Sequence, residues 1–284
     1  MQFSKMHGLG NDYVVFGFNE IPDIDFGTLA VKLCHRYFGV GADGLIAVLP
    51  SEGRDFRMRI FNSDGSEAEM CGNGIRCATK YFIDNLMPES RRPSGDGELR
   101  LKAETQAGER GVVATWQNGQ VGLMTVSMGK PILDPPSIPV SVEGERAIDV
   151  PLEACGRTFK ATCVSMGNPH AVIFVDEDVD AAPVLTAGPV IEKLPIFPKK
   201  TNVEFINVIS DKELKMRVWE RGVGETLACG TGTCASVVAA NITGRAGRDV
   251  TVHLPGGDLM IKLDDSGEVL MTGPAATVFT GTLL

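Results

Sequence analysis

Two cysteines are followed by nearly the same short sequence, one in each half of the chain. Cys71 precedes Gly-Asn-Gly and Cys229 precedes Gly-Thr-Gly. A free thiol has a pKa of ~8.5 and a helix N-terminus lowers it, so one thiolate and one thiol can coexist near neutral pH. A thiolate can act as a base where a hydroxyl cannot. Such a pair suits inversion of a carbon stereocentre, in which one group removes a proton and the other delivers one from behind.

The glycines beside both cysteines predict a sharp turn into a helix. Gly72, Gly74, Gly230 and Gly232 allow the backbone to turn tightly and to approach a ligand closely. The N–H groups at two helix starts can bind one carboxylate and stabilise the negative charge that moves onto it as the α-proton leaves. This stabilisation would replace an external electron sink, so we expect no pyridoxal phosphate.

The two cysteines belong to a longer internal repeat. Residues 56–74 align without gaps on residues 214–232, a shift of 214 − 56 = 158, and six of the nineteen positions are identical. A shorter echo relates Gly10-Asn11 to Gly167-Asn168 at nearly the same shift. A repeat at half the chain length indicates a duplicated domain and not a solenoid of many short units. Two similar lobes usually pack about a pseudo-twofold axis, which would set the two cysteines on opposite sides of one bound molecule.

The elements that must position these residues follow the same repeat. Strands are predicted at 13–18, 45–49, 56–61, 99–103, 112–116 and 121–126 in the first half, and at 171–175, 203–209, 214–219, 250–254, 259–263 and 269–272 in the second. Helices are predicted at 28–37, 74–86, 181–193 and 232–242. The last of these has hardly any charge, so we expect it to be buried on all sides. A proline-rich connector at 131–139 separates the halves.

Composition limits the classes of function. The chain of 284 residues has 43% hydrophobic and 22% charged residues, a net charge of −9 and a pI near 5.0. An acidic globular protein of this kind is not expected to bind nucleic acid or an anionic membrane, since both require clustered Lys and Arg. Seven cysteines without an export signal predict reduced thiols in the cytoplasm.

Several longer motifs, taken together, resemble those of the diaminopimelate epimerase family. They are found at residues 6–12, 61–66, 70–77, 166–170, 220–222 and 228–232, in order along nearly the whole chain. The resemblance implies interconversion of L,L- and meso-2,6-diaminopimelate for lysine and peptidoglycan synthesis, by a homodimer that uses no metal or organic cofactor. It also implies an α+β fold of two pseudo-symmetric lobes, each with a mixed or antiparallel sheet wrapped around a central helix. We expect lobes at 1–127 and 128–274, with a strand in 275–284 returning to the first.

The resemblance also assigns roles to individual residues. Cys71 and Cys229 match the two acid–base thiols. The backbone cradle for the reacting carboxylate is matched by Gly72, Asn73, Gly230 and Thr231, and the residues that hold the substrate by Asn11, Asn62, Asn168, Asn202, Glu220 and Arg221. His170 and Glu220 match polar groups that tune the thiols. Gly44 departs from members that have a side-chain amide at this position.

Other interpretations of the same residues remain open at this stage. A proline- or histidine-type racemase would use the same two thiols. However, Glu220, Arg221 and Asn202 favour a substrate that has a second amino and carboxylate group at its far end. A non-catalytic binding protein would bind an amino acid without exchanging its α-hydrogen. Cys77 and Cys234 follow the catalytic cysteines at spacings wider than structural zinc sites usually have, so we interpret them as core thiols.

Overall fold

Residues 1–284 are described by a computed structural model, which divides into two compact units. The first unit comprises Met1–Ser127 and Thr272–Leu284, and the second comprises Met128–Met271. Both combine a mixed sheet with two α-helices, so the α+β class and the duplication expected from the sequence are confirmed. No helix is long and apolar enough to span a membrane.

In the first unit the strands lie in the order β18-β1-β2-β3-β4-β6-β7-β8. These are Ala276–Thr282, Gln2–Gly8, Asn11–Gly17, Gly44–Leu49, Phe56–Asn62, Gly97–Thr105, Gly108–Gln117 and Gln120–Ser127, and the short β5 (Glu67–Ala68) pairs with β4. Pairing is parallel for β2–β3 and β4–β6 and antiparallel for the others. The helices are α1 (Phe26–Cys34) and α2 (Gly72–Asn85).

The second unit repeats this topology. Its strands are β9 (Val150–Ala154), β10 (Arg157–Ser165), β11 (Pro169–Val175), β12 (Asn202–Ser210), β13 (Glu213–Glu220), β14 (Gly224–Thr226), β15 (Asp249–Leu254) and β16 (Gly257–Leu263), and β17 (Val269–Gly273) crosses into the residue range of the first unit. The pairs β11–β12 and β13–β15 are parallel, as β2–β3 and β4–β6 are in the first unit. The helices are α3 (Val184–Ile191) and α4 (Gly230–Ile242).

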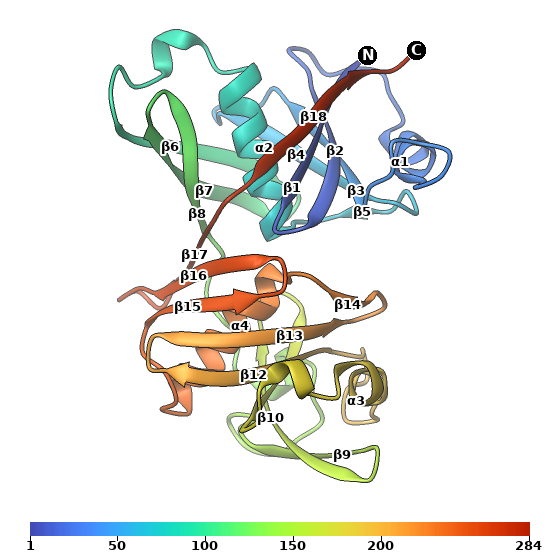
Figure 1. Ribbon diagram of the computed structural model, residues 1–284, viewed down its shortest axis with the longest axis vertical. Helices are drawn as coiled ribbons and strands as arrows, with labels where there is room; N and C mark the ends of the chain where they lie inside the picture. The colour runs from blue at the N-terminus through green and yellow to red at the C-terminus, as the bar shows by residue number, and fades with distance from the viewer. The chain divides into compact units, whose positions relative to one another are not determined.

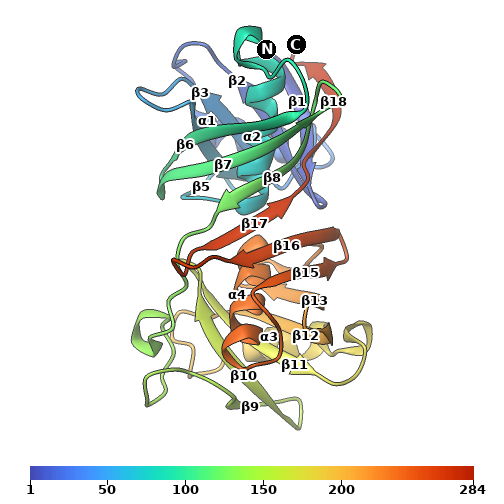
Figure 2. The same ribbon diagram turned by 90° about the vertical axis from the view of Figure 1, so that its left-hand side faces the viewer.

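Each sheet curves around one central helix (Figures 1 and 2). In the first unit α2 packs against β1, β2, β3, β4 and β8, and in the second α4 packs against β10, β11, β12 and β16. A helix enclosed in this way needs small or apolar residues on most of its surface, and α4 is buried at all but three of its residues, as its nearly uncharged sequence predicts. The outer helices α1 and α3 cover the other face of the sheets and close the two hydrophobic cores.

Several element boundaries differ from those expected. Helix α1 begins at Phe26 because the Asp25 side chain accepts hydrogen bonds from two N–H groups of the first turn, and it ends at Cys34 because His35 is extended. Helix α3 is shorter than expected because Pro183 forms its N-cap. Strands β1, β5, β9, β10 and β14 lie outside the strands expected from the sequence. The C-terminal strand β18 pairs with β1 over Gln2–His7.

Candidate functional site

In the first unit the predicted site residues gather at one edge of the sheet. Asn11 begins β2, and the neighbouring parallel strand β3 begins at Gly44. Asn62 ends the antiparallel strand β4 directly opposite Gly44, and its side chain donates to Ser66 Oγ at 2.9 Å. Helix α2 begins at the same edge, because Asn73 in its first turn contacts Asn11. The edge therefore combines strand ends with a helix start.

The Cys71 thiol lies within a cluster of polar side chains. Its Sγ is 3.1 Å from the Tyr13 hydroxyl and 3.7 Å from Asn11 Oδ1. The hydroxyl also donates to Asn11 Oδ1, which accepts a longer bond of 3.4 Å from Asn73 Nδ2. Burial, followed by the nearby Cys71, holds the pKa of Tyr13 well above its usual value. Tyr13 therefore keeps its proton, which can serve either Asn11 or a thiolate at Cys71.

A set of charged residues fixes the orientation of the Asn11 amide. Asn11 Nδ2 donates to Asp43 Oδ2 at 2.9 Å, and Asp43 Oδ1 pairs with Arg36 at 2.7 Å. Asp12 contacts both Arg36 and the largely buried Lys5, 2.6 Å away. Although burial raises the pKa of Asp12, its hydrogen bond and charge interaction with Lys5 lower it below the usual range overall. These ion pairs leave Asn11 Oδ1 directed at the Tyr13 hydroxyl.

Both cysteines are the N-cap residues of the central helices. Cys71 and Cys229 have extended backbones, and neither side chain makes a capping hydrogen bond. The first helical bonds return to the cysteine carbonyls from Ile75 and Thr233, at 2.9 Å each. Each helix therefore begins with N–H groups that it does not use itself, and these carry the positive end of the helix dipole.

The second unit gathers its site residues at the equivalent edge. Asn168 directly precedes β11, Asn202 begins β12, and Glu220 ends β13. These positions correspond to Asn11, Gly44 and Asn62 at shifts of 157 or 158 residues. The amide absent at Gly44 is thus present at Asn202, where it donates to Pro169 O at 2.8 Å and accepts from Arg221 N at 2.9 Å. A side chain at Gly44 would lie 2.6 Å from the Phe61 carbonyl oxygen, which accounts for the glycine.

A chain of hydrogen bonds leads away from the Cys229 thiol. Cys229 Sγ is 3.6 Å from Thr231 Oγ1, which accepts from Asn168 Nδ2 at 3.2 Å. Asn168 Oδ1 is 3.0 Å from His170 Nε2, and His170 Nδ1 is 2.7 Å from Glu204 Oε1. His170 and Glu204 are completely buried.

The surroundings of Cys229 favour the protonated thiol. Burial raises its pKa well above the usual value, and the nearby carboxyl groups of Glu220 and Glu204 raise it further when they are ionised, against an opposing hydrogen bond from Thr231. Glu220 is oriented by Thr226, whose hydroxyl donates to it at 2.5 Å. Cys71 is partly exposed and has a hydroxyl group, not a carboxylate, as its neighbour. The two thiols are therefore in electrostatically different surroundings.

Within each unit the structure brings most of the predicted site residues together. The first-unit cluster contains Asn11, Cys71 and Asn73, with Gly72 between the last two. The second-unit cluster contains Asn168, His170, Asn202, Glu220, Arg221, Cys229, Gly230 and Thr231. Arg221 is exposed, and its guanidinium donates to Lys199 O at 3.2 Å.

Sequence reasoning missed Tyr13, Asp43 and Glu204. The internal repeat contained a signal for Tyr13, because it aligns with His170 at the same shift that relates Asn11 to Asn168. Glu204 aligns with Ile46, so its importance could be found only from its contact with His170 across the parallel pair β11–β12.

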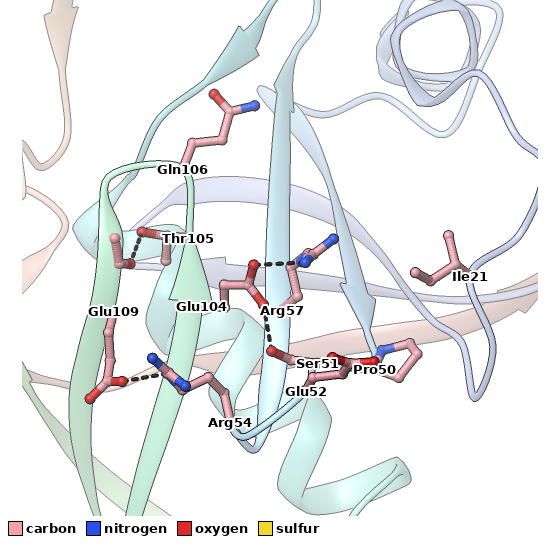
Figure 3. Close-up of a pocket in the computed structure, with 11 residues that line it drawn as sticks. Ile21, Pro50, Ser51, Glu52, Arg54, Arg57, Glu104, Thr105, Gln106 and Glu109 are labelled. Carbon is pink, nitrogen blue, oxygen red and sulfur yellow. Dashed lines mark hydrogen bonds and ion pairs between the residues drawn. The ribbon is translucent and has the colours of Figure 1, made fainter.

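Two cavities of the structure lie away from these clusters. A cavity of about 730 Å³ in the first unit is lined by residues of β4, β6 and the adjoining loops. Arg57 pairs there with Glu104 at 2.7 Å and Arg54 pairs with Glu109, so these four ionic side chains are matched within the cavity (Figure 3). A cavity of about 650 Å³ in the second unit also contains none of the predicted site residues. No cluster of three or more His, Cys, Asp or Glu side chains has an arrangement that could hold a metal ion.

Comparison with known proteins gives matches along the whole chain. A family model described as diaminopimelate epimerase matches residues 3–133 and 162–278. The diaminopimelate epimerase of Moorella thermoacetica is 53% identical over 283 residues, which cover 99% of this chain and 98% of that protein. That of Desulfitobacterium hafniense is 53% identical over 289 residues and covers 100% and 98%, and that of Methanococcus maripaludis is 47% identical over 284 residues and covers 100% and 99%.

Solved structures share the fold at low sequence identity. A probable proline racemase from Agrobacterium radiobacter superposes with a TM-score of 0.73 at 18% identity, covering 100% of this chain and 92% of that one. A hydroxyproline epimerase from Agrobacterium vitis has a TM-score of 0.70 at 18% identity, covering 99% and 90%. These two structures support the two-lobed architecture alone.

Proposed function

This chain belongs to the diaminopimelate epimerase family, and from that premise we propose that it interconverts L,L- and meso-2,6-diaminopimelate with Cys71 and Cys229 as opposed acid and base. The observation that carries this proposal is the duplicated N-cap. Each thiol occupies the start of its unit's central helix, and neither makes a capping bond. A duplicated fold with one such cysteine in each half is suited to bracket a single tetrahedral carbon.

In the proposed reaction the α-carboxylate binds at the two helix starts, through the backbone of Gly72-Asn73 and Gly230-Thr231. A thiolate on one face takes the α-proton, and the electron pair left on carbon spreads into the carboxylate. The unused helix N–H groups stabilise that charge, and one such donor contributes roughly 3–4 kcal/mol to lowering the barrier. The thiol on the other face then gives its proton to carbon, which inverts the centre.

Recognition of the non-reacting end is assigned to the polar residues at the sheet edges. Arg221 is suited to a carboxylate, since a guanidinium forms two parallel hydrogen bonds with it, and Glu220 is suited to an ammonium group. Asn11, Asn62, Asn168 and Asn202 supply amides that can bind either group. A shorter amino acid would leave these groups without partners. The enzyme should therefore select against proline and other substrates that have an amino-acid group at one end only.

The proposal includes a homodimer in the cytoplasm that uses neither a metal nor an organic cofactor. All seven cysteines are free, which agrees with a reducing compartment. The helix starts take the part that an electron-accepting cofactor would play in other amino-acid racemases.

Deuterium incorporation tests the proposal directly. L,L-diaminopimelate incubated with the enzyme in D₂O, without any added cofactor, should acquire deuterium at the α-carbon and form the meso isomer. Cys71→Ala and Cys229→Ala should each lose net epimerisation, because each removes one of the two proton carriers. Cys155→Ala is the matched control, since that thiol is exposed and lies outside both clusters. Substantial turnover in either site variant contradicts the two-thiol mechanism, and binding without exchange favours a binding protein.

A further inference from the structure

Glu204 is a completely buried acid that lies beside the catalytic thiol of the second unit. One carboxyl oxygen, Oε1, contacts His170, while the other, Oε2, has no hydrogen-bond partner although it is buried. A methyl group built on Gly232 would lie 2.6 Å from Glu204 Oε1 and 3.2 Å from Cys229 Sγ. The carboxyl and the thiol therefore flank the same glycine at the start of α4.

The duplication shows that the fold itself does not require an acid at this position. Glu204 lies on β12, two residues after Asn202, as Ile46 lies on β3 two residues after Gly44. In the first unit Gly74 is the equivalent glycine, and a methyl group on it would lie 3.4 Å from Ile46 and 3.4 Å from Cys71. The position next to Cys71 that the Ile46 side chain occupies is thus occupied next to Cys229 by the Glu204 carboxyl group.

The hydrogen-bond chain determines how His170 and Glu204 interact. Asn168 Nδ2 donates to Thr231, so Asn168 Oδ1 accepts a hydrogen bond from His170 Nε2. With a proton on Nε2, only Nδ1 faces Glu204 Oε1, at 2.7 Å. One proton between these two atoms completes the bond, whether it resides on nitrogen or on oxygen. Without that proton, two acceptors would meet in a buried site and the carboxylate would have no charge partner, which is strongly unfavourable.

We propose that Glu204 is a positioning residue that shares this proton with His170, and that loss of the proton from this pair opposes loss of the proton from Cys229. The inference rests on the proposed function and adds the residue that sets the resting state of the second thiol. A bare Glu204 carboxylate and a Cys229 thiolate would be two negative charges on either side of Gly232 in a buried environment. Each therefore opposes the ionisation of the other.

Apart from His170, the other titratable groups around Glu204 also disfavour a bare carboxylate at this position. His170 faces it from β11, Cys163 interacts with it from β10, Glu220 from β13 and Cys229 from the start of α4. Burial raises the pKa of Glu204, with His170 opposing and Glu220 adding to the rise. Cys163, Cys229 and Glu220 supply no positive charge that would stabilise a bare carboxylate. The shared proton is therefore retained near neutrality, and so is the proton on Cys229.

The pH profile of Glu204→Gln tests this inference. Glutamine has nearly the same shape and can donate to His170 Nδ1, so it imitates the protonated acid but can never ionise. We expect kcat/KM near pH 7 to stay within about fivefold of the wild-type value, because the hydrogen-bond chain is kept. The decline at alkaline pH should begin at lower pH, because Cys229 loses its proton more readily. A loss by the same factor at every pH would show a merely structural role and overturn the proposal.

Alkylation of the resting enzyme gives a second, independent measurement. Iodoacetamide labelling at alkaline pH, where the wild-type pair can lose its proton, should be at least about threefold faster at Cys229 in Glu204→Gln when it is resolved by peptide mass spectrometry, since a fall of half a pKa unit triples the thiolate fraction. Labelling of Cys71 reports any general opening of the protein. Unchanged or slower labelling of Cys229 contradicts the proposal.

A matched control and a spectroscopic measurement separate this role from folding. Ser236→Ala removes another buried polar group of α4, one that donates to Gly232 O at 2.7 Å, and should leave the shape of the pH profile unchanged. Imidazole ¹⁵N NMR should show a His170 proton shared with Glu204 that disappears in Glu204→Met. If that signal is present in both proteins, Glu204 does not share the proton. If wild-type enzyme does not epimerise diaminopimelate, the proposed function fails, while the alkylation and NMR results still decide the role of Glu204.

Discussion

Tyr13 and His170 occupy equivalent positions of the duplicated fold and make the same first contact. Each bonds to the amide oxygen of the asparagine two residues before it, Asn11 in one unit and Asn168 in the other. Beyond that contact they differ. The tyrosine hydroxyl reaches its cysteine directly, whereas the histidine contacts a buried acid. Duplication has thus kept the geometry around the two thiols while the chemistry of the surrounding residues has diverged.

Tyr13→Phe should slow the half-reaction in which Cys71 is the base. The variant removes a hydroxyl 3.1 Å from the sulfur, and a hydrogen bond to a charged group contributes about 1.5–3 kcal/mol, or roughly 10- to 100-fold in rate. Exchange of the substrate α-proton into D₂O, measured separately from each isomer, checks this. Tyr81→Phe is the control, because it removes another buried tyrosine hydroxyl of the same unit, one that interacts with the Gly17 backbone. Equal losses in the two variants would indicate a general effect on folding.

The buried thiols of the hydrophobic cores make the free energy of unfolding depend on pH in the alkaline range. Burial raises the pKa of Cys163 to about 12, whereas an unfolded thiol has a pKa near ~8.5. Above the unfolded value the unfolded chain loses this proton and the folded chain keeps it. The stabilisation is therefore complete at lower pH and is lost as pH rises towards the folded value.

Urea unfolding at several pH values between 9.5 and 10.5 measures that loss. Wild-type stability should fall more steeply with pH than that of Cys163→Ala, by up to about 1.4 kcal/mol per pH unit for the one thiol removed. Parallel slopes in the two proteins would mean that the thiol ionises equally in both states. Cys155→Ala, which removes an exposed thiol, should keep the wild-type slope.

At the scale of elements, the packing around the first turns of α2 and α4 determines which substitutions each turn can accept. Each begins with a cysteine N-cap and has a glycine as its third helical residue, Gly74 in α2 and Gly232 in α4. A methyl group on Gly74 would meet the Ile60 Cδ1 atom at 2.9 Å, the end of a flexible side chain. On Gly232 it would meet the Glu204 carboxyl, which His170 holds in place.

Gly232→Ala should therefore damage the enzyme much more than Gly74→Ala. Alanine in a helix is favoured over glycine by about 1 kcal/mol, so Gly74→Ala should be as stable as the wild type and retain activity within a few-fold. Gly232→Ala should lose at least about tenfold in kcat/KM, because displacing Glu204 disturbs the hydrogen-bond chain to Cys229. Steady-state kinetics and melting temperatures of both variants check this, and comparable activity in the two would contradict the tight packing around Gly232.

At the scale of the whole molecule, the strands of the two units pair in the same order. The strand at one edge of this order, however, comes from a different part of the chain in each unit. In the second unit β9 pairs with β10 and immediately precedes it. In the first unit β18 pairs with the equivalent strand β1, although it comes from the opposite end of the chain. The sheet of the first unit is therefore complete only when β18 has been made.

Removal of residues 275–284 should destabilise the first unit selectively. The deletion leaves β1 without its antiparallel partner and removes Phe279 from its edge contact with Phe3. At about 0.5–1.5 kcal/mol for each hydrogen bond, the loss of this pairing should amount to several kcal/mol. Hydrogen exchange measured by mass spectrometry should become faster in β1 and β2 and remain unchanged in β9–β11. Uniform acceleration in both units would instead show that they unfold as one.

The sequence alone determined the duplication, the two cysteines, the α+β class and most of the strands, because these depend on local pattern and on the comparison of the chain with itself. It also predicted which asparagines bind the substrate, and three of them, Asn11, Asn168 and Asn202, lie at or next to the starts of strands. Tertiary structure decided what surrounds each thiol. Glu204 lies 34 residues from His170 along the chain and meets it only because β11 and β12 pair in parallel with one particular register. Contacts of this kind depend on strand order and register, which no short stretch of sequence specifies.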